Sequence, residues 1–223
     1  TSVPLASQPG RPIAWAMRCR RCSRWIDSAA ALKYLTENLN ISELAPTLRK
    51  AALAGWAKSE PEAAVAVSFE LSKTNRDPAQ FANTLANWAT VDLDASSQWL
   101  INRLPVGPER TAAAGELGTI FGQQSPEAGI TWLNKLNPGA ERDAAASSLL
   151  QEWSRMDPEA AAKWAAKQNF ANLSKTSIAR MNQNFMMKNP PKFEAWRSAL
   201  PAGPLKDHTD KTKPLQFAED EKD

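Results

Sequence analysis

Large aromatic side chains recur along the chain at a nearly constant interval. Most of them shortly precede a run rich in Pro, Glu and Ala, as in W-A-K-S-E-P-E-A-A at 56–64 and W-S-R-M-D-P-E-A-A at 153–161. These leading aromatics are Trp56, Trp88, Phe121, Trp153 and Phe185. An interval of about 32 residues, kept this regularly, is the signature of a repeat architecture.

A second aromatic position keeps step with the first. Four of the leading aromatics are followed by a tryptophan at one constant offset, and Val67 takes that position after Trp56. The four tryptophans are Trp99, Trp132, Trp164 and Trp196. Tyr34 stands one period before Val67, which predicts an earlier and weaker unit at roughly 12–44. The two markers together predict about six repeats, each of roughly 32–33 residues.

Each unit has the pattern of a helix, a tight break and a second helix. Apolar residues in the first helix stand three or four positions apart, as Leu53 and Trp56 do, which is the spacing of one helical face. The break joins a capping residue to a proline, and proline suits the first position of a helix. These pairs are Glu60–Pro61, Ser125–Pro126, Asp157–Pro158 and Asn189–Pro190. Ser, Asp and Asn are good caps, whereas Glu60 is a poor one.

The second helix pairs a small residue with a large one four positions later. Ala128 precedes Trp132 in this way, and Ala160 precedes Trp164. Residues four apart share a helical face, so we expect close helix approach at the alanine and an indole filling the space beside it. Segments rich in Gly and Pro at 104–110, 136–142 and 200–206 then end the unit.

A single helix pair cannot cover its own apolar face, so successive units must stack on one another. The sequence therefore predicts an all-α fold, a right-handed α-solenoid of about six two-helix repeats. We expect a disordered N-terminal segment at 1–11 and the helical repeat domain at 12–204. The charged segment at 205–223 is expected to be disordered or a frayed helix, because it combines high charge density with Pro214.

Composition narrows the function only slightly. The 27 basic and 24 acidic residues give a net charge of +3, spread along the chain, so bulk charge does not favour a nucleic-acid partner. No stretch approaches the roughly 18 consecutive apolar residues of a membrane helix. The chain begins with Thr1, and residues 1–12 lack the apolar core of a signal peptide, which leaves the compartment open.

The two cysteines, Cys19 and Cys22, form a C-R-R-C motif. A zinc site needs four ligands and the one histidine, His208, lies in the charged tail, so we expect no metal and no cofactor. A redox pair is an alternative because the neighbouring arginines favour thiolates, but this segment has a helical pattern. The basic run at 17–25 is a candidate nucleic-acid patch, with a solvated terminal helix as the preferred interpretation.

The period and the helix-turn-helix unit resemble tetratricopeptide and HEAT-type helical repeats over roughly 23–204. The tetratricopeptide run W-x2-L-G-x2-Y is not met, because A-K-S-E-P follows Trp56. The unit is more similar to that of uncharacterised bacterial repeat proteins with a recurring W-x4-P-E-A-A pattern. That family implies no activity, whereas the broader resemblance implies a surface for proteins or peptides.

Polar residues recur one and five positions before most leading aromatics, although Ile120 interrupts the series. Residues four apart share a helical face, so stacking would align them into a mostly uncharged stripe across the units. The predicted contact residues are Asn83, Asn87, Glu116, Ser148, Glu152, Arg180 and Asn184. The alternative is that these side chains are simply solvated. Low charge suits a protein or peptide ligand better than a polyphosphate.

No constellation for catalysis is present. His208 has no Ser, Cys or carboxylate partner in a recurring arrangement, and no Gly-rich phosphate loop occurs, so we expect no enzyme. The preferred function is a non-enzymatic protein- or peptide-binding scaffold. The alternative is a structural spacer module of a larger protein, and a nucleic-acid-binding helical repeat ranks behind both. The sequence leaves the oligomeric state open.

Overall fold

The computed structural model describes residues 45–212. The chain divides into two units, 1–49 and 50–223, and nearly all of the described residues belong to the second. The predicted first repeat at 12–44, both cysteines and the basic run at 17–25 lie outside the described residues. The same holds for the end of the chain from 213 onward.

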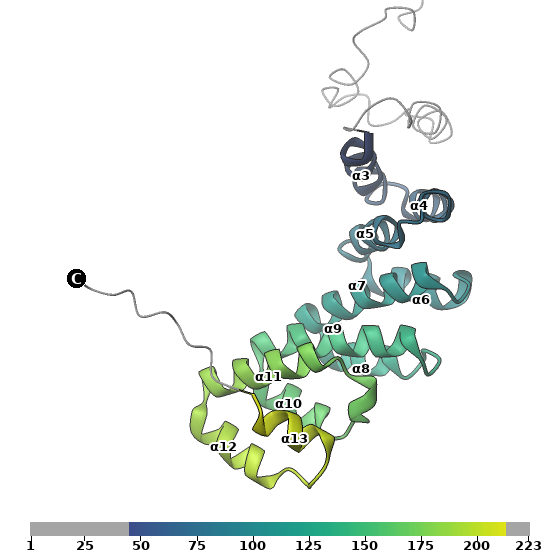
Figure 1. Cartoon of the computed structure of the whole chain (residues 1–223). Coiled ribbons are helices and arrows are strands. Elements are labelled where there is room, and N and C mark those ends of the chain that lie inside the picture. The colour runs from purple at the N-terminus through teal and green to yellow at the C-terminus, as the bar shows by residue number, and fades with distance from the viewer. Residues whose placement is uncertain (1–44, 213–223) are drawn as a thin grey trace, which may run out of the picture. The chain divides into compact units, whose positions relative to one another are not determined.

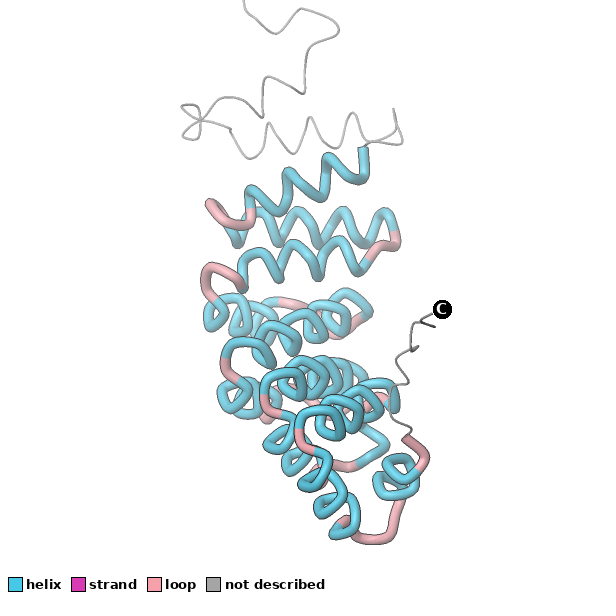
Figure 2. Tube along the Cα trace, turned by 90° about the vertical axis from the view of Figure 1, so that its left-hand side faces the viewer, coloured by secondary structure: helices cyan, strands magenta, loops and turns pink. Residues whose placement is uncertain are grey.

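The described residues form eleven α-helices and one 3-10 turn and contain no strand (Figures 1 and 2). The helices that carry a leading aromatic, here called first helices, are α3 (Ala45–Trp56), α5 (Pro78–Ala89), α7 (Pro108–Gln124), α9 (Ala140–Met156) and α11 (Lys175–Lys188). The second helices are α4 (Pro61–Asn75), α6 (Leu93–Arg103), α8 (Pro126–Leu133), α10 (Pro158–Ala165) and α12 (Pro190–Ala199). The 3-10 turn η2 (Phe170–Asn172) precedes α11, and α13 (Pro204–Asp210) follows α12. The predicted all-α class is confirmed for residues 45–212.

Within the second unit, first helices pack on first helices. Helix α7 packs against α5 on one side and α9 on the other, and α9 in turn packs against α11 (Figure 1). Each second helix from α6 to α12 packs on the first helix before it. Among the described helices, α6, α8, α10 and α12 make no contact of comparable extent with one another. No helix in this part of the chain is both long enough and apolar enough to cross a membrane.

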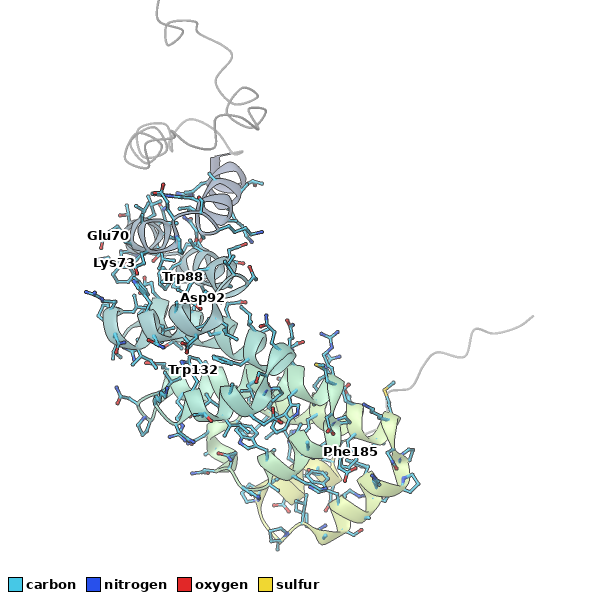
Figure 3. All side chains as sticks on the ribbon, turned by 180° about the vertical axis from the view of Figure 1, so that it is seen from behind. Glu70, Lys73, Trp88, Asp92, Trp132 and Phe185 are labelled. Atoms are coloured by element: carbon cyan, nitrogen blue, oxygen red, sulfur yellow. The ribbon has the colours of Figure 1, made fainter. Side chains whose placement is uncertain are left out.

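In the four units from α5 to α12 the two aromatic markers contact one another. The ring centroids of Phe121 and Trp132 lie 5.0 Å apart in a stacked arrangement. The other pairs are Trp88–Trp99 at 6.2 Å, Trp153–Trp164 at 6.1 Å and Phe185–Trp196 at 5.9 Å. Trp88, Trp132 and Phe185 are buried and lie at successive levels of the helix stack (Figure 3). Trp99, Trp164 and Trp196 are only half-buried. Aromatic contact of this kind adds to the free energy gained from area burial alone.

Two of the four predicted capping residues, Asp157 and Asn189, cap second helices, whereas Glu60, expected to be a poor cap, makes no capping bond. Asp157 Oδ1 accepts a hydrogen bond from the Ala160 amide at 3.0 Å, and Asn189 Oδ1 accepts one from Lys192 at 3.2 Å. Asp92 caps α6 in the same way through the Ala95 amide at 2.9 Å. The expectation for Ser125 is wrong, because its side chain makes no capping hydrogen bond to α8. Proline at N1 still starts that helix, since a missing N–H is harmless there.

Helices α7 and α9 approach one another at two glycines. A Cβ atom on Gly118 would overlap the carbonyl oxygen of Ala145 and lie 2.9 Å from its Cα. A Cβ on Gly122, one turn later, would lie 2.7 Å from the carbonyl oxygen of Leu149. Only glycine permits such an approach between two backbones. These positions hold the two first helices in direct backbone contact.

A buried ion pair also links α7 to α9. Arg110 Nε lies 2.7 Å from Glu141 Oε2, and both side chains are less than a tenth exposed. Arg110 also donates from Nη1 to the carbonyl of Leu104 at 2.6 Å. Lys206, three repeats later, donates in the same way to the carbonyl of Arg197 at 3.1 Å. A cation after the end of a second helix thus donates to main-chain carbonyls near that end, where intrahelical donors run out.

A second ion-pair group connects α10 to α12. Glu159 lies 2.8 Å from Lys163 Nζ and 2.7 Å from Lys192 Nζ. The hydrogen bonds from Lys163 and Lys192 lower the pKa of Glu159 to about 2, and the Glu159 carboxylate raises the pKa of Lys192. The group is largely in solvent, so we expect a modest contribution to the contact between these second helices.

Helix α13 falls in the segment for which the sequence predicts a charged tail. It packs against α11, where the buried Asn182 Nδ2 donates to Thr209 Oγ1 at 3.2 Å and to Thr212 Oγ1 at 3.1 Å. Asn182 stands two repeats after Gly118, and Thr209 stands two repeats after Ala145. The α11–α13 contact therefore uses the same register as the close contact between α7 and α9.

Candidate binding face on the first helices

The seven predicted contact residues lie on α5, α7, α9 and α11, and they form two rows. One row stands one position before the leading aromatic: Asn87, Glu152 and Asn184. The other stands five positions before it: Asn83, Glu116, Ser148 and Arg180. The structure places the two rows in different surroundings, so they differ in what they offer to a partner.

Most of the first row forms bonds between neighbouring helices. Glu152 is 8% exposed, and its Oε2 accepts from Gln123 Nε2 of α7 at 3.1 Å and pairs with Arg155 Nη1 at 3.1 Å. Asn184 Nδ2 donates to Ser154 Oγ of α9 at 2.9 Å. These polar contacts join α7 to α9 and α9 to α11. The side chains are therefore only partly available to a ligand.

The asparagines of α5 bond within their own helix. Asn83 Nδ2 donates to the carbonyl of Ala79 at 2.7 Å, and Asn87 Nδ2 donates to the carbonyl of Asn83 at 2.8 Å. Both side chains are half-buried. Bonds of this i to i−4 kind compete weakly with the backbone and leave each amide oxygen available.

The second row is more open on the later repeats. Glu116 and Arg180 are exposed, and neither forms an ion pair with another residue of the described segment. Ser148 is half-buried, and a Cβ on Gly115 of α7 would lie 3.7 Å from its hydroxyl oxygen. These three side chains lie on first helices that pack side by side, α7, α9 and α11.

A third row, missed from the sequence, lies two positions before the leading aromatic. Thr119, Gln151 and Gln183 are half-buried and recur in three successive repeats. Each lies three positions after a residue of the open row and so shares its helical face. Thr119 Oγ1 donates to the carbonyl of Gly115 at 3.3 Å, whereas the amides of Gln151 and Gln183 have no hydrogen-bond partner within residues 45–212. The sequence did contain a signal for this row, because a polar residue recurs two positions before the leading aromatic in these three repeats.

A cleft of about 480 Å³ opens between the start of α9 and the segment η2–α11. The cleft exists because α11 begins later in its repeat than α9 does. The first residue of α11, Lys175, stands closer in the chain to Phe185 than the first residue of α9, Ala140, stands to Trp153. The polar lining consists of Asp143, Ser147, Ser148, Asn172, Ser174 and Ser177. Ser147 Oγ accepts from the Ser174 amide at 2.8 Å, so part of this lining holds the α11 start in place.

Asp143 contributes a carboxylate to the lining of the cleft. Burial raises the pKa of Asp143 above its ordinary value, and the nearby charge of Arg142 partly opposes this effect. With several hydroxyl groups around it, the cleft offers hydrogen bonds to a polar ligand group. No group of three or more His, Cys, Asp or Glu side chains in residues 45–212 is arranged to hold a metal ion.

Comparison with protein-family models, with curated proteins and with solved structures finds no match for this chain.

Proposed function

We propose that the chain is a right-handed α-solenoid of about six two-helix repeats and acts as a non-enzymatic scaffold. In this proposal a protein or peptide partner binds across the first helices. The resemblance to tetratricopeptide and HEAT-type repeats is part of the same proposal. One observation carries it: in the described part of the chain, first helices pack extensively on neighbouring first helices, whereas second helices make no contact of comparable extent with one another.

Unequal packing of the two layers implies curvature. Where neighbouring helices of one layer approach closely and those of the other layer diverge, the close layer lies on the inner side of the curve. The glycine contacts of α7 with α9 represent the tight side of this arrangement. The first helices would then line a concave surface, the usual binding surface of helical repeat proteins.

The chemistry of this surface suits a polypeptide ligand. Gln151 and Gln183 each carry an amide that both donates and accepts hydrogen bonds, as a peptide main chain requires. They lie beside Ser148 and Arg180, and Ser148 also lines the cleft at the start of α9. A surface dominated by amides and hydroxyls fits an extended peptide or a partner helix better than a polyphosphate.

The test adds the same charges to each layer separately. Gln151→Lys with Gln183→Lys alters the first-helix face, and Thr131→Lys with Ala195→Lys alters exposed positions on second helices. Affinity capture from native lysate should recover stoichiometric partners with the original chain and with the second-helix variant, and lose them with the first-helix variant. Both variants should retain the original unfolding midpoint. Partners lost only with the second-helix variant would contradict the proposal.

A further inference from the structure

A groove of about 210 Å³ lies between the C-terminal ends of α8 and α10 and is also lined by Arg142 and Ala146 of α9. Its apolar lining includes Ile130, Leu133 and Trp164, and its polar lining includes Asn134, Arg142 and Gln168. Trp164 is half-buried, whereas Trp132, its counterpart one repeat earlier, is 4% exposed. Part of an indole is therefore accessible beside two aliphatic side chains.

Arg142 differs from its counterpart in the preceding repeat. That counterpart, Arg110, lies 2.7 Å from the carboxylate of Glu141. The position equivalent to Glu141 in the next repeat is Leu173, so the corresponding acid is missing for Arg142. Arg142 donates one hydrogen bond, from Nη2 to the side-chain oxygen of Asn134 at 3.2 Å. It forms no ion pair within residues 45–212.

Helix capping does not account for this arginine. Arg110 donates to the carbonyl of Leu104, and Lys206 donates to that of Arg197. Arg142 instead donates to a neutral side-chain amide, which leaves most of its five N–H donors without a partner in the described segment. Burial raises the pKa of Asp143, the next residue, and the charge of Arg142 partly opposes this effect, but Asp143 lines the other cleft, between α9 and α11.

Two more cations are chain neighbours of residues that line the groove. Lys135 follows Asn134 in the chain and Lys167 precedes Gln168, and both lysines are exposed. Neither forms an ion pair in the part of the chain that the structure describes. An apolar recess with a half-buried tryptophan, lined by Arg142 and adjoined in the chain by two exposed lysines, none of the three in an ion pair within residues 45–212, is complementary to an apolar group flanked by carboxylates.

We propose that this groove is a second docking site, which takes an acidic peptide segment through one large apolar side chain. The side chain would lie against Ile130, Leu133 and Trp164. Neighbouring carboxylates would pair with Arg142, whose fork of N–H donors matches carboxylate geometry, and with the two lysines. The site is formed by the C-terminal ends of α8 and α10 together with Arg142 near the start of α9, and it does not depend on ligand binding to the first-helix face.

The direct probe is the acetylated and amidated peptide Gly-Glu-Phe-Glu-Asp-Gly, compared with a neutral form in which Gln and Asn replace the acids. Each is titrated into the full chain labelled with nitrogen-15, and the indole N–H signal of Trp164 is followed by NMR. Trp164→Phe identifies that signal. We expect the acidic peptide to shift it and to bind about tenfold more tightly than the neutral peptide, with an affinity that falls as salt is added.

Two arginine variants separate the groove from general charge attraction. Arg142→Gln should weaken binding of the acidic peptide about tenfold. Arg103→Gln removes an exposed arginine at the end of α6 and should leave the affinity unchanged. Equal binding of both peptides, an unchanged affinity in Arg142→Gln, or no shift of Trp164 would each overturn the proposal. A Trp164 signal that moves on dilution without peptide would also overturn it, because a second copy would then occupy the groove.

Discussion

The close contact of α7 with α9 predicts that one substitution, glycine to alanine, changes stability in opposite directions at two positions of α7. Gly118→Ala places a methyl group against the Ala145 backbone, with its Cβ 2.9 Å from Ala145 Cα and overlapping the Ala145 carbonyl oxygen. Backbone atoms cannot rotate away, so the two helices must separate. Gly115→Ala, one turn earlier, meets only the Ser148 hydroxyl at 3.7 Å, which is an ordinary contact.

The expected magnitudes follow from two opposing effects. Alanine in place of glycine within a helix stabilises by about 1 kcal/mol. Overpacking against an unyielding neighbour costs about 1–3 kcal/mol, and contact with backbone belongs at the upper end of that range. Gly118→Ala should therefore lower the free energy of unfolding by about 2 kcal/mol. Gly115→Ala should raise it by up to about 1 kcal/mol.

Urea unfolding of the full chain, followed by circular dichroism, measures both changes. The two variants share the same helix and the same chemical substitution, so Gly115→Ala controls for intrinsic helix propensity. If Gly118→Ala were as stable as the original chain, or if both variants shifted the midpoint in the same direction, the close approach of α7 to α9 would be wrong.

Three further predictions concern the interior and the surface. Glu141→Gln should reduce stability by about 3–5 kcal/mol because it leaves the buried Arg110 charge unpaired. Arg110→Met combined with Glu141→Leu should be near neutral. A urea midpoint of the double variant below that of Glu141→Gln would contradict this. Trp132→Ala should cost about 3–5 kcal/mol, and a loss below about 1 kcal/mol would place the ring outside the core. Glu159 has a depressed pKa of about 2, so its contribution is present above the ordinary carboxylate pKa and lost as pH falls toward about 2. The stability difference from Glu159→Gln should therefore disappear in acid and shrink in high salt, and a difference that grew on acidification would reverse the sign of this argument.

Local signals made much of the helix pattern predictable from the sequence. The break before each second helix is set by residues adjacent in the chain, such as Asp157 beside Pro158, and the capping bond at Ala160 follows. Ser125 shows where this logic fails. A serine at the N-cap position can bond to the backbone, but proline at N1 with a suitable backbone path starts α8 without that bond.

Predictions that depended on neighbouring helices were less complete. The periodicity of α9 alone placed Glu152 on a polar face, yet the α7 side chain Gln123 covers it. The role of Gly118 was also hidden, because a glycine inside a helix gains meaning only from the backbone facing it. Both features depend on contacts between residues of successive repeats, which a single-helix pattern does not encode.

Spin-label distances test the central claim that the first helices form the inner layer. With Cys19 and Cys22 replaced by serine, one label pair is placed at Thr119 and Gln183 on first helices. The other pair is placed at Thr131 and Ala195 on second helices, and each pair spans two repeats. Double electron–electron resonance should give a shorter distance for the first-helix pair than for the second-helix pair. Equal distances, or a longer one between the first helices, would contradict a concave face on that layer.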